Sequence, residues 1–257
     1  MTLNHQRTTM AECPLTLERA PPLPKRRRLR YEDADEFECT GESGRRRMAN
    51  QSAAWQEHIE RLRACRLCSD VFPPPVLGAV PGARVYLMGQ APGPKEVKLG
   101  RPFAYTAGKT LFRWFASIGV NEEEFRARVT MAAVIRCFPG KLPNKQGDRK
   151  PSRAEAERCR PHYLTELELL RPGLVLPVGK MAIEQFLPPA TLDEIIGRSF
   201  RRGDGPRSHD VIPLPHPSGL SRWIQSPESK EMIGQALALI ARHPAWVETF
   251  GRRAPPA

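Results

Sequence analysis

Four of the six cysteines in this chain are spaced like metal ligands. Cys65 and Cys68 form a Cys-x-x-Cys pair, whereas Cys137 and Cys159 lie far downstream, each beside an arginine. Four thiolates are the number that a structural zinc ion or an iron–sulfur cluster takes, so these residues predict a metal centre. Thiolates alone suit either metal. The other two cysteines lie in a polar N-terminal segment, and we interpret them as incidental.

Two short loops hold the polar groups that could act on a ligand. The first covers residues 89–93, Gly-Gln-Ala-Pro-Gly, and its glycines let the backbone approach a ligand closely. The second covers residues 216–218, His-Pro-Ser, whose histidine can donate a hydrogen bond to a ligand or simply cap a strand end. Residues 107–110 resemble the end of a phosphate-binding loop, but Phe103 stands where that motif requires glycine, which excludes it.

The hydrophobic pattern predicts the elements that position these loops. Apolar runs predict buried strands at residues 84–88, 129–135, 174–178 and 211–214. Apolar residues at helical spacing predict helices at residues 53–64, 107–118, 153–170 and 228–242, with a further helix opening at Gly179. Alternating strands and helices imply an α/β fold with a parallel sheet covered on both faces. Both loops and the stretch near Arg136 follow strands, so they are expected to meet in one cleft at the carboxyl edge of the sheet.

The charge of the chain suggests a polyanionic partner. The formal net charge is +12, of which residues 1–50 carry about +2 and the remaining residues about +10. Nucleic acid is the expected partner, and a solubilising surface is the alternative. No apolar run is long enough to span a membrane and no signal core follows the N-terminus, so we expect a cytoplasmic protein without membrane attachment. We expect residues 1–50 to form a disordered tail, residues 51–250 one domain, and residues 251–257 a flexible C-terminus.

Residues 65–240 resemble the uracil-DNA glycosylase superfamily, and within it the iron–sulfur families 4 and 5. The matching segments are Gly89-Gln90-Ala91-Pro92-Gly93, Gly100-Arg101-Pro102-Phe103, Ala107-Gly108, the four cysteines and His216-Pro217-Ser218-Gly219-Leu220. The resemblance implies a three-layer α/β/α sandwich with a central four-stranded parallel sheet. It also implies that the four cysteines hold a [4Fe–4S] cluster, with zinc as the alternative, and that the chain excises uracil from single- or double-stranded DNA.

The resemblance assigns roles to residues in this sequence. A glycosylase flips the nucleotide into a pocket, where Phe103 would stack on uracil with Ala91 and Ser218 nearby. His216 would donate to uracil O2, where negative charge grows as the glycosidic bond breaks. Leu220 would fill the space that the base leaves. The alternatives are a core aromatic for Phe103, a strand-end cap for His216 and an ordinary surface side chain for Leu220.

Four departures from the family pattern change these expectations. Gln90 stands where family 4 has glutamate, and an amide cannot act as a base. Glu96 aligns with a second acidic position and is expected, with Gln90, to place the attacking water. Ala133 replaces an asparagine that reads the uracil edge, and Tyr105 is expected to wall the pocket against a thymine methyl group. One relative in the superfamily traps DNA covalently through a histidine in a basic insert. The corresponding residues 138–158 contain no histidine here, so covalent trapping of DNA is not expected.

These features predict a monomeric, monofunctional glycosylase of base excision repair that leaves an abasic site. Two alternatives remain. Gln90 and Ala133 suggest a non-catalytic binder of damaged or single-stranded DNA on the same fold. The four thiolates also suit a zinc-stabilised nucleotide-binding protein.

Overall fold

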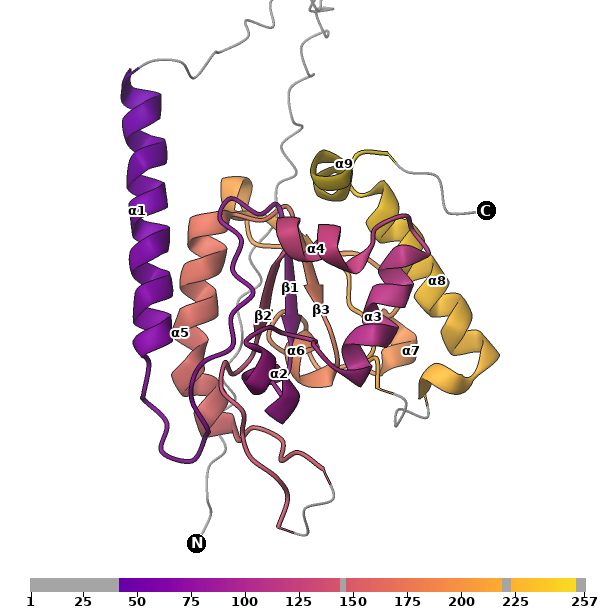
Figure 1. The fold of residues 1–257 in the computed structure, drawn as a ribbon. Coiled ribbons are helices and arrows are strands. Elements are labelled where there is room, and N and C mark those ends of the chain that lie inside the picture. The colour runs from indigo at the N-terminus through magenta and orange to yellow at the C-terminus, as the bar shows by residue number, and fades with distance from the viewer. Residues whose placement is uncertain (1–41, 144–146, 219–222, 253–257) are drawn as a thin grey trace, which may run out of the picture. The chain divides into compact units, whose positions relative to one another are not determined.

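The computed structural model describes residues 42–143, 147–218 and 223–252, which build a five-stranded sheet (Figure 1). The strands are β1 (Val85–Gly89), β2 (Thr130–Ala133), β3 (Leu174–Pro177), β4 (Phe200–Arg202) and β5 (His209–Val211), in the order β2-β1-β3-β5-β4. The pairs β1–β2, β1–β3 and β3–β5 are parallel, whereas β4 pairs antiparallel with β5 at the edge. The predicted four-stranded parallel sheet is confirmed, and an antiparallel fifth strand extends it.

Helices cover both faces of this sheet. They are α1 (Glu42–Ala64), α2 (Pro94–Leu99), α3 (Thr106–Ala116), α4 (Glu122–Arg128), α5 (Arg153–Leu170), α6 (Lys180–Ile183), α7 (Leu192–Ile195), α8 (Pro227–Arg242) and α9 (Pro244–Phe250), with 3₁₀ turns η1 (Gly205–Arg207) and η2 (Trp223–Gln225). Figure 1 shows α1 and α5 on one side of the strands and α3 and α8 on the other. The sheet is therefore the middle of three layers, as predicted.

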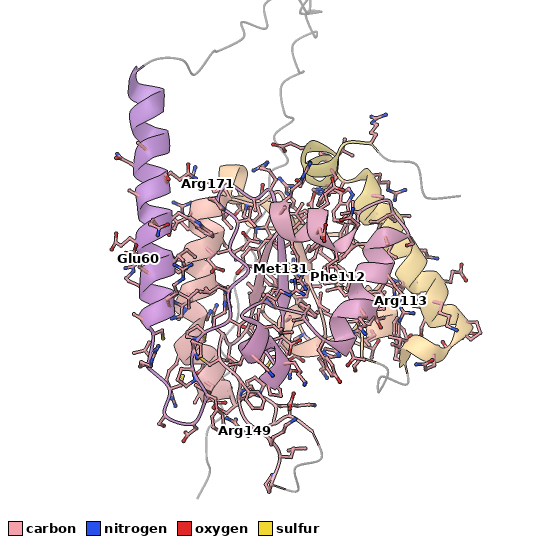
Figure 2. The ribbon with its side chains drawn as sticks, in the orientation of Figure 1. Glu60, Phe112, Arg113, Met131, Arg149 and Arg171 are labelled. Atoms are coloured by element: carbon pink, nitrogen blue, oxygen red, sulfur yellow. The ribbon has the colours of Figure 1, made fainter. Side chains whose placement is uncertain are left out.

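Burial on both faces explains why the central strands are continuous apolar runs. Every residue of β1 and β3 is buried, including the adjacent Tyr86 and Leu87, whose side chains point to opposite faces. Tyr86 pairs with Thr130 of β2 and Val175 of β3, so β1 lies between two neighbours. The buried side chains of Met131 on β2 and Phe112 on α3 belong to the same core (Figure 2).

Several predicted boundaries were wrong, and β2, for example, ends at Ala133 and not at residue 135. Helix α1 begins at Glu42 and not at residue 53, so the end of the segment predicted to lack structure is helical; residues 1–41 lie outside the described part. The fourth parallel strand begins at His209, two residues earlier than predicted, and its pairing reaches Leu214 through a bridge with Val178. His209 and Asp210 are polar and only half-buried, so they do not continue the apolar run from which the strand was predicted.

The parallel strands place their carboxyl ends at one edge of the sheet. The loop at residues 89–93 follows β1, and residues 216–218 follow the extended β5. Within the described ranges, no helix is both long and apolar enough to cross a membrane.

Candidate active site and cysteine cavity

A cleft of about 410 Å³ opens where the loop after β1 meets the loop after β5. The segment before α3 and the end of β2 complete its wall. Seven of the site residues predicted from sequence line this cleft, namely Gln90, Ala91, Glu96, Phe103, Tyr105, His216 and Ser218. The eighth, Leu220, falls in residues 219–222, outside the described part of the chain. Segments that are far apart in the sequence therefore form one concave site.

His216 lies at the mouth of the cleft as a neutral hydrogen-bond donor. Its Nδ1 accepts a hydrogen bond from the backbone N–H of Ser218 at 3.3 Å, so the ring proton is assigned to Nε2. His216 is exposed by surface area, yet the protein atoms packed around its ring displace part of the surrounding water, and this desolvation lowers the pKa of His216. Gly179 leaves space for the loop, since a Cβ there would lie 3.3 Å from His216 Cβ. The Nε2–H group is thus available to a ligand at neutral pH.

Phe103 is held in the cleft by unusually close backbone packing. Its φ of 49° lies in the left-handed region, which non-glycine residues rarely adopt. The ring lies against Gly89, where a Cβ would approach Phe103 Cζ to 2.8 Å. Gly108 is tighter still, because a Cβ there would lie 1.8 Å from the Phe103 carbonyl oxygen. Glycine at both positions is therefore a steric requirement of the Phe103 conformation.

Arg126, on α4, holds the same loop from the other side. Its guanidinium donates to the carbonyl oxygens of Pro102 at 2.8 Å and Phe103 at 2.9 Å. An ion pair with Glu122 at 2.8 Å and a position 4.6 Å from the Phe112 ring centroid orient it. The sequence analysis missed α4 and Arg126. The available signal was Asn121, an N-cap residue that precedes three glutamates and accepts a hydrogen bond from the Glu124 amide.

Glu96 lines the cleft, but both of its carboxylate oxygens already accept hydrogen bonds. Oε2 accepts from the backbone N–H of Gly93, the N-cap residue of α2, at 3.2 Å. Oε1 accepts from the backbone N–H of Ala104 at 3.0 Å. Glu96 therefore connects the loop after β1 to the loop that carries Phe103.

The remaining wall of the cleft is less polar than the family pattern implies. Gln90 is half-buried, and its backbone carbonyl oxygen, not its side chain, accepts a hydrogen bond from the Ile135 backbone N–H at 3.2 Å. Ala133 lines the cleft and has no amide to offer. Tyr105 is 55% exposed at the rim, where Lys95 Nζ lies 5.8 Å from its ring centroid.

Asp148 also lines the cleft, and the sequence analysis did not single it out. It lies between Cys137 and Cys159, in a segment from which the sequence analysis selected no site residue. Its Oδ1 forms an ion pair with Lys141 Nζ at 2.6 Å. A Cβ at Gly93 would lie 3.2 Å from its Oδ2. No local pattern marks this residue, because only the tertiary fold returns the segment to the loop after β1.

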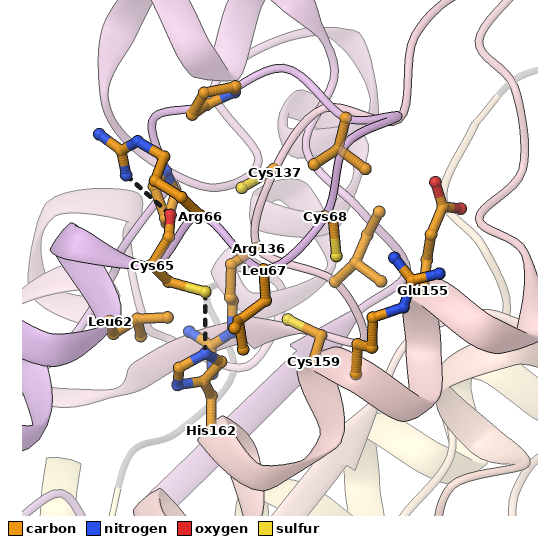
Figure 3. Close-up of a pocket in the computed structure, with 15 residues that line it drawn as sticks. Leu62, Cys65, Arg66, Leu67, Cys68, Arg136, Cys137, Glu155, Cys159 and His162 are labelled. Atoms are coloured by element: carbon orange, nitrogen blue, oxygen red, sulfur yellow. Dashed lines mark hydrogen bonds between the residues drawn. The ribbon is translucent and has the colours of Figure 1, made fainter.

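A second cavity brings the four predicted cysteines together (Figure 3). Cys65 and Cys68 follow α1, Cys137 follows β2, and Cys159 lies on α5. All four are free and half-buried. Burial, followed by the neighbouring thiols, raises the pKa of Cys137 to about 12. His162 joins the group, with Nε2 3.4 Å from Cys65 Sγ.

The donor chemistry of this cavity fits a metal centre with sulfur ligands. Soft thiolates select zinc, copper or iron–sulfur clusters. In the described residues, however, no three His, Cys, Asp or Glu side chains are grouped closely enough to hold a single metal ion. Figure 3 shows the four sulfur atoms distributed around a shared space.

A buried charged network lies next to the cysteine cavity. Glu166 on α5 pairs with Arg136, accepts from the Tyr86 hydroxyl at 2.5 Å, and lies 3.6 Å from His58 Nε2 on α1. Burial by itself would raise the pKa of Glu166, but Arg136, the neighbouring His58 and the hydrogen bond from Tyr86 hold it below its usual value. The network therefore connects α1, α5 and β1. It includes Arg136, the residue immediately before Cys137.

Comparison with known proteins agrees with this geometry. Residues 75–240 match the family model of the uracil DNA glycosylase superfamily. The Type-4 uracil-DNA glycosylase of Archaeoglobus fulgidus is 28% identical over 172 residues, which is 63% of this chain and 80% of that protein. The Type-4 enzyme of Pyrobaculum aerophilum is 31% identical over 47% of this chain and 56% of its own length. That of Thermotoga maritima is 29% identical over 54% of this chain and 67% of its own length.

The family match covers more than half of the chain, and it includes the cleft and two of the four cysteines. Together with the parallel sheet and the loops at its carboxyl edge, this match shows that the chain belongs to the uracil DNA glycosylase superfamily.

Proposed function

We propose that this chain is a uracil-DNA glycosylase, a hydrolase that cleaves the N-glycosidic bond between uracil and deoxyribose in DNA and leaves an abasic site. The relatives named Type-4 uracil-DNA glycosylase support the activity. The structural observation that carries the proposal is the convergence of the Phe103 ring and the neutral His216 side chain on one cleft. An aromatic face and a fixed N–H donor are what a flipped pyrimidine needs.

In the proposed mechanism the uracil leaves as an anion. The base enters the cleft and stacks on Phe103, while Nε2–H of His216 donates to O2. As the bond between C1′ and N1 breaks, its electron pair stays on uracil, and the His216 donor stabilises the charge on O2. Ser218 fixes the ring by donating to Nδ1. Water then attacks C1′.

The other proposed contacts set the base preference. Gln90 and the backbone near Ala91 would hydrogen-bond the uracil edge, since Ala133 has no amide for that task. Tyr105 would exclude a thymine methyl group from the rim. Leu220 would act as the wedge in the DNA stack, a role that concerns residues outside the described part of the chain.

We propose that Cys65, Cys68, Cys137 and Cys159 hold a [4Fe–4S] cluster. A zinc ion needs its sulfur ligands about 2.3 Å from a single point. The four half-buried thiols line one cavity and suit either group, and the resemblance to the iron–sulfur families favours the cluster over zinc. The cluster would supply a structural link between the end of α1, the end of β2 and α5, because metal binding also stabilises the fold.

Metal analysis tests the cofactor. Iron and sulfide in equal amounts, without zinc, are expected in the purified protein. Cys137→Ser should lower the iron content and the soluble yield, whereas Cys39→Ser, outside the proposed ligand set, should leave both unchanged. Stoichiometric zinc, or full iron content in Cys137→Ser, would contradict the proposed cluster. The four cysteines without disulfides support a reducing, cytoplasmic location.

A uracil-release assay tests the function. Labelled oligonucleotides with a single uracil, in single-stranded and duplex form, are incubated with excess protein and then cleaved at abasic sites. Strand cleavage is expected with uracil and not with thymine at the same position. A chain that binds both oligonucleotides but releases no uracil would instead be a non-catalytic DNA binder, the alternative that Gln90 and Ala133 favour.

A further inference from the structure

Hydrolysis at C1′ needs a group that can accept a proton from water. As the glycosidic bond breaks, C1′ gains positive charge, and a carboxylate nearby both stabilises that charge and orients the attacking water. Gln90, in the loop after β1, has an amide that accepts no proton at neutral pH. Among the described residues that line the cleft, the carboxylates are Glu96 and Asp148.

Glu96 is committed to the backbone. Both of its oxygens accept hydrogen bonds from backbone N–H groups, at Gly93 and at Ala104. Proton transfer to either oxygen would remove the negative charge that strengthens both of these contacts. Glu96 is therefore suited to hold the two loops together.

Asp148 reaches the same loop from the segment between Cys137 and Cys159. Its Oδ1 pairs with Lys141, which leaves Oδ2 directed toward Gly93. Gly93 leaves room for both carboxylates, because a Cβ there would lie 2.9 Å from Glu96 Oε2 and 3.2 Å from Asp148 Oδ2. Lys141 also offsets the repulsion between Asp148 and the nearby Glu96.

The segment that carries Asp148 is fixed by its neighbour Arg149 (Figure 2). Arg149 donates to both oxygens of Glu155, at 2.7 and 2.8 Å, and to the carbonyl oxygens of Pro139 and Asp70, at 2.9 Å each. Its backbone N–H donates to the Gly140 carbonyl at 2.8 Å. Asp148 is thus attached to a constrained part of the segment, which favours a defined position in the cleft.

We propose that Asp148 is the catalytic carboxylate of this chain and replaces the glutamate that position 90 lacks. The bond between C1′ and N1 breaks with its electron pair on uracil. A water oxygen forms the new bond to C1′, and its proton passes to Oδ2 of Asp148 and then to solvent. This inference rests on the proposed function and adds a catalytic residue from outside the loop after β1.

Single-turnover kinetics on a uracil oligonucleotide test the proposal. Asp148→Asn keeps the size of the side chain and removes the proton acceptor, so the cleavage rate should fall by about 10²–10⁴-fold, the range for a general base. DNA affinity should stay equal or increase, because a negative charge near the phosphates is lost. Glu157→Gln removes an exposed ion pair with Arg153 on α5, away from the lining of the cleft, and should leave rate and affinity unchanged.

Chemical rescue separates catalysis from a structural role. In Asp148→Ala, added formate can occupy the vacated space and accept the proton, so uracil release should increase with formate concentration. The wild-type protein and Glu157→Gln should not respond. A purely structural role for the Asp148–Lys141 pair would lower the melting temperature and would not be rescued.

The outcomes separate this inference from the proposed function. Absence of uracil release by the wild-type protein would overturn the glycosylase proposal itself. Release by the wild-type protein with an unchanged rate in Asp148→Asn would overturn only the role of Asp148. A slow Asp148→Asn variant without formate rescue of Asp148→Ala would overturn it as well, because the defect would then be structural.

Discussion

His216 can act as a donor because its other ring nitrogen is already occupied. Ser218 donates to Nδ1, and desolvation lowers the ring pKa, so the neutral form with a proton on Nε2 is present at pH 7 and above. Protonation of Nδ1 at low pH would break the contact with Ser218. The tautomer can be checked by ¹⁵N chemical shifts of the imidazole, which should report a protonated Nε2 and an unprotonated Nδ1 at pH 7.

The kinetic prediction for His216 follows from where the charge develops. His216→Ala should slow cleavage by about 10²–10³-fold, as for loss of one oxyanion donor. DNA affinity should change little, because phosphate contacts dominate it. Single-turnover rates at saturating protein, with binding measured separately, give both values. A wild-type rate in His216→Ala would contradict this role, and Gln90 and the neighbouring amides would then be the candidates for stabilising the leaving uracil.

Phe103 should affect capture of the base and not the bond-breaking step. Loss of one stacking contact costs about 1–3 kcal/mol, so Phe103→Ala should weaken the productive complex by a corresponding factor. The effect should appear as a higher protein concentration for half-maximal cleavage. A pure loss of maximal rate, with unchanged half-saturation, would contradict a stacking role.

At the scale of elements, the start of α3 determines where the Phe103 loop can lie. Gly108 belongs to the first turns of α3, and a Cβ there would overlap the Phe103 carbonyl oxygen at 1.8 Å. Gly108→Ala should therefore displace the loop, lower the melting temperature and reduce uracil release. The shift would also affect the hydrogen bonds by which Arg126 holds the Phe103 carbonyl oxygen and Glu96 holds the Ala104 amide.

Gly234 in α8 is the matched control. It is exposed, and a Cβ there would meet nothing within 4 Å. Gly234→Ala should raise stability by about 1 kcal/mol through helix propensity and leave activity unchanged. Equal loss of activity in both alanine variants would show that the Gly108 effect is not a matter of packing against Phe103.

At the scale of the whole molecule, the net charge of +12 predicts salt-dependent DNA binding. Each neutralised phosphate releases counterions, and about six contacts would lower the affinity about 10³-fold between roughly 50 and 200 mM salt. Fluorescence anisotropy with an oligonucleotide without uracil measures this slope apart from catalysis. A flat response would contradict a basic DNA-binding face.

The features of the fold that follow from the hydrophobic pattern could be predicted from the sequence. The apolar runs of β1 and β3 identify buried parallel strands, because a strand covered on both faces carries no polar alternation. The loops that follow parallel strands meet at the carboxyl edge, and those after β1 and β5 contribute Gln90, Ala91, His216 and Ser218 to one cleft. Short elements such as α4 and β4 were missed, since they are too short to show a period.

The sequence by itself determined the parallel α/β architecture, the grouping of the four cysteines and the loops that build the cleft, because each is encoded in local pattern or spacing. Only the tertiary structure decided what the carboxylates do. Glu96 is bound by an amide that lies eight residues away, and Asp148 reaches Gly93 from a segment that follows α2, α3, α4 and β2 in the chain. Such contacts depend on how distant segments pack, and no local sequence pattern specifies them.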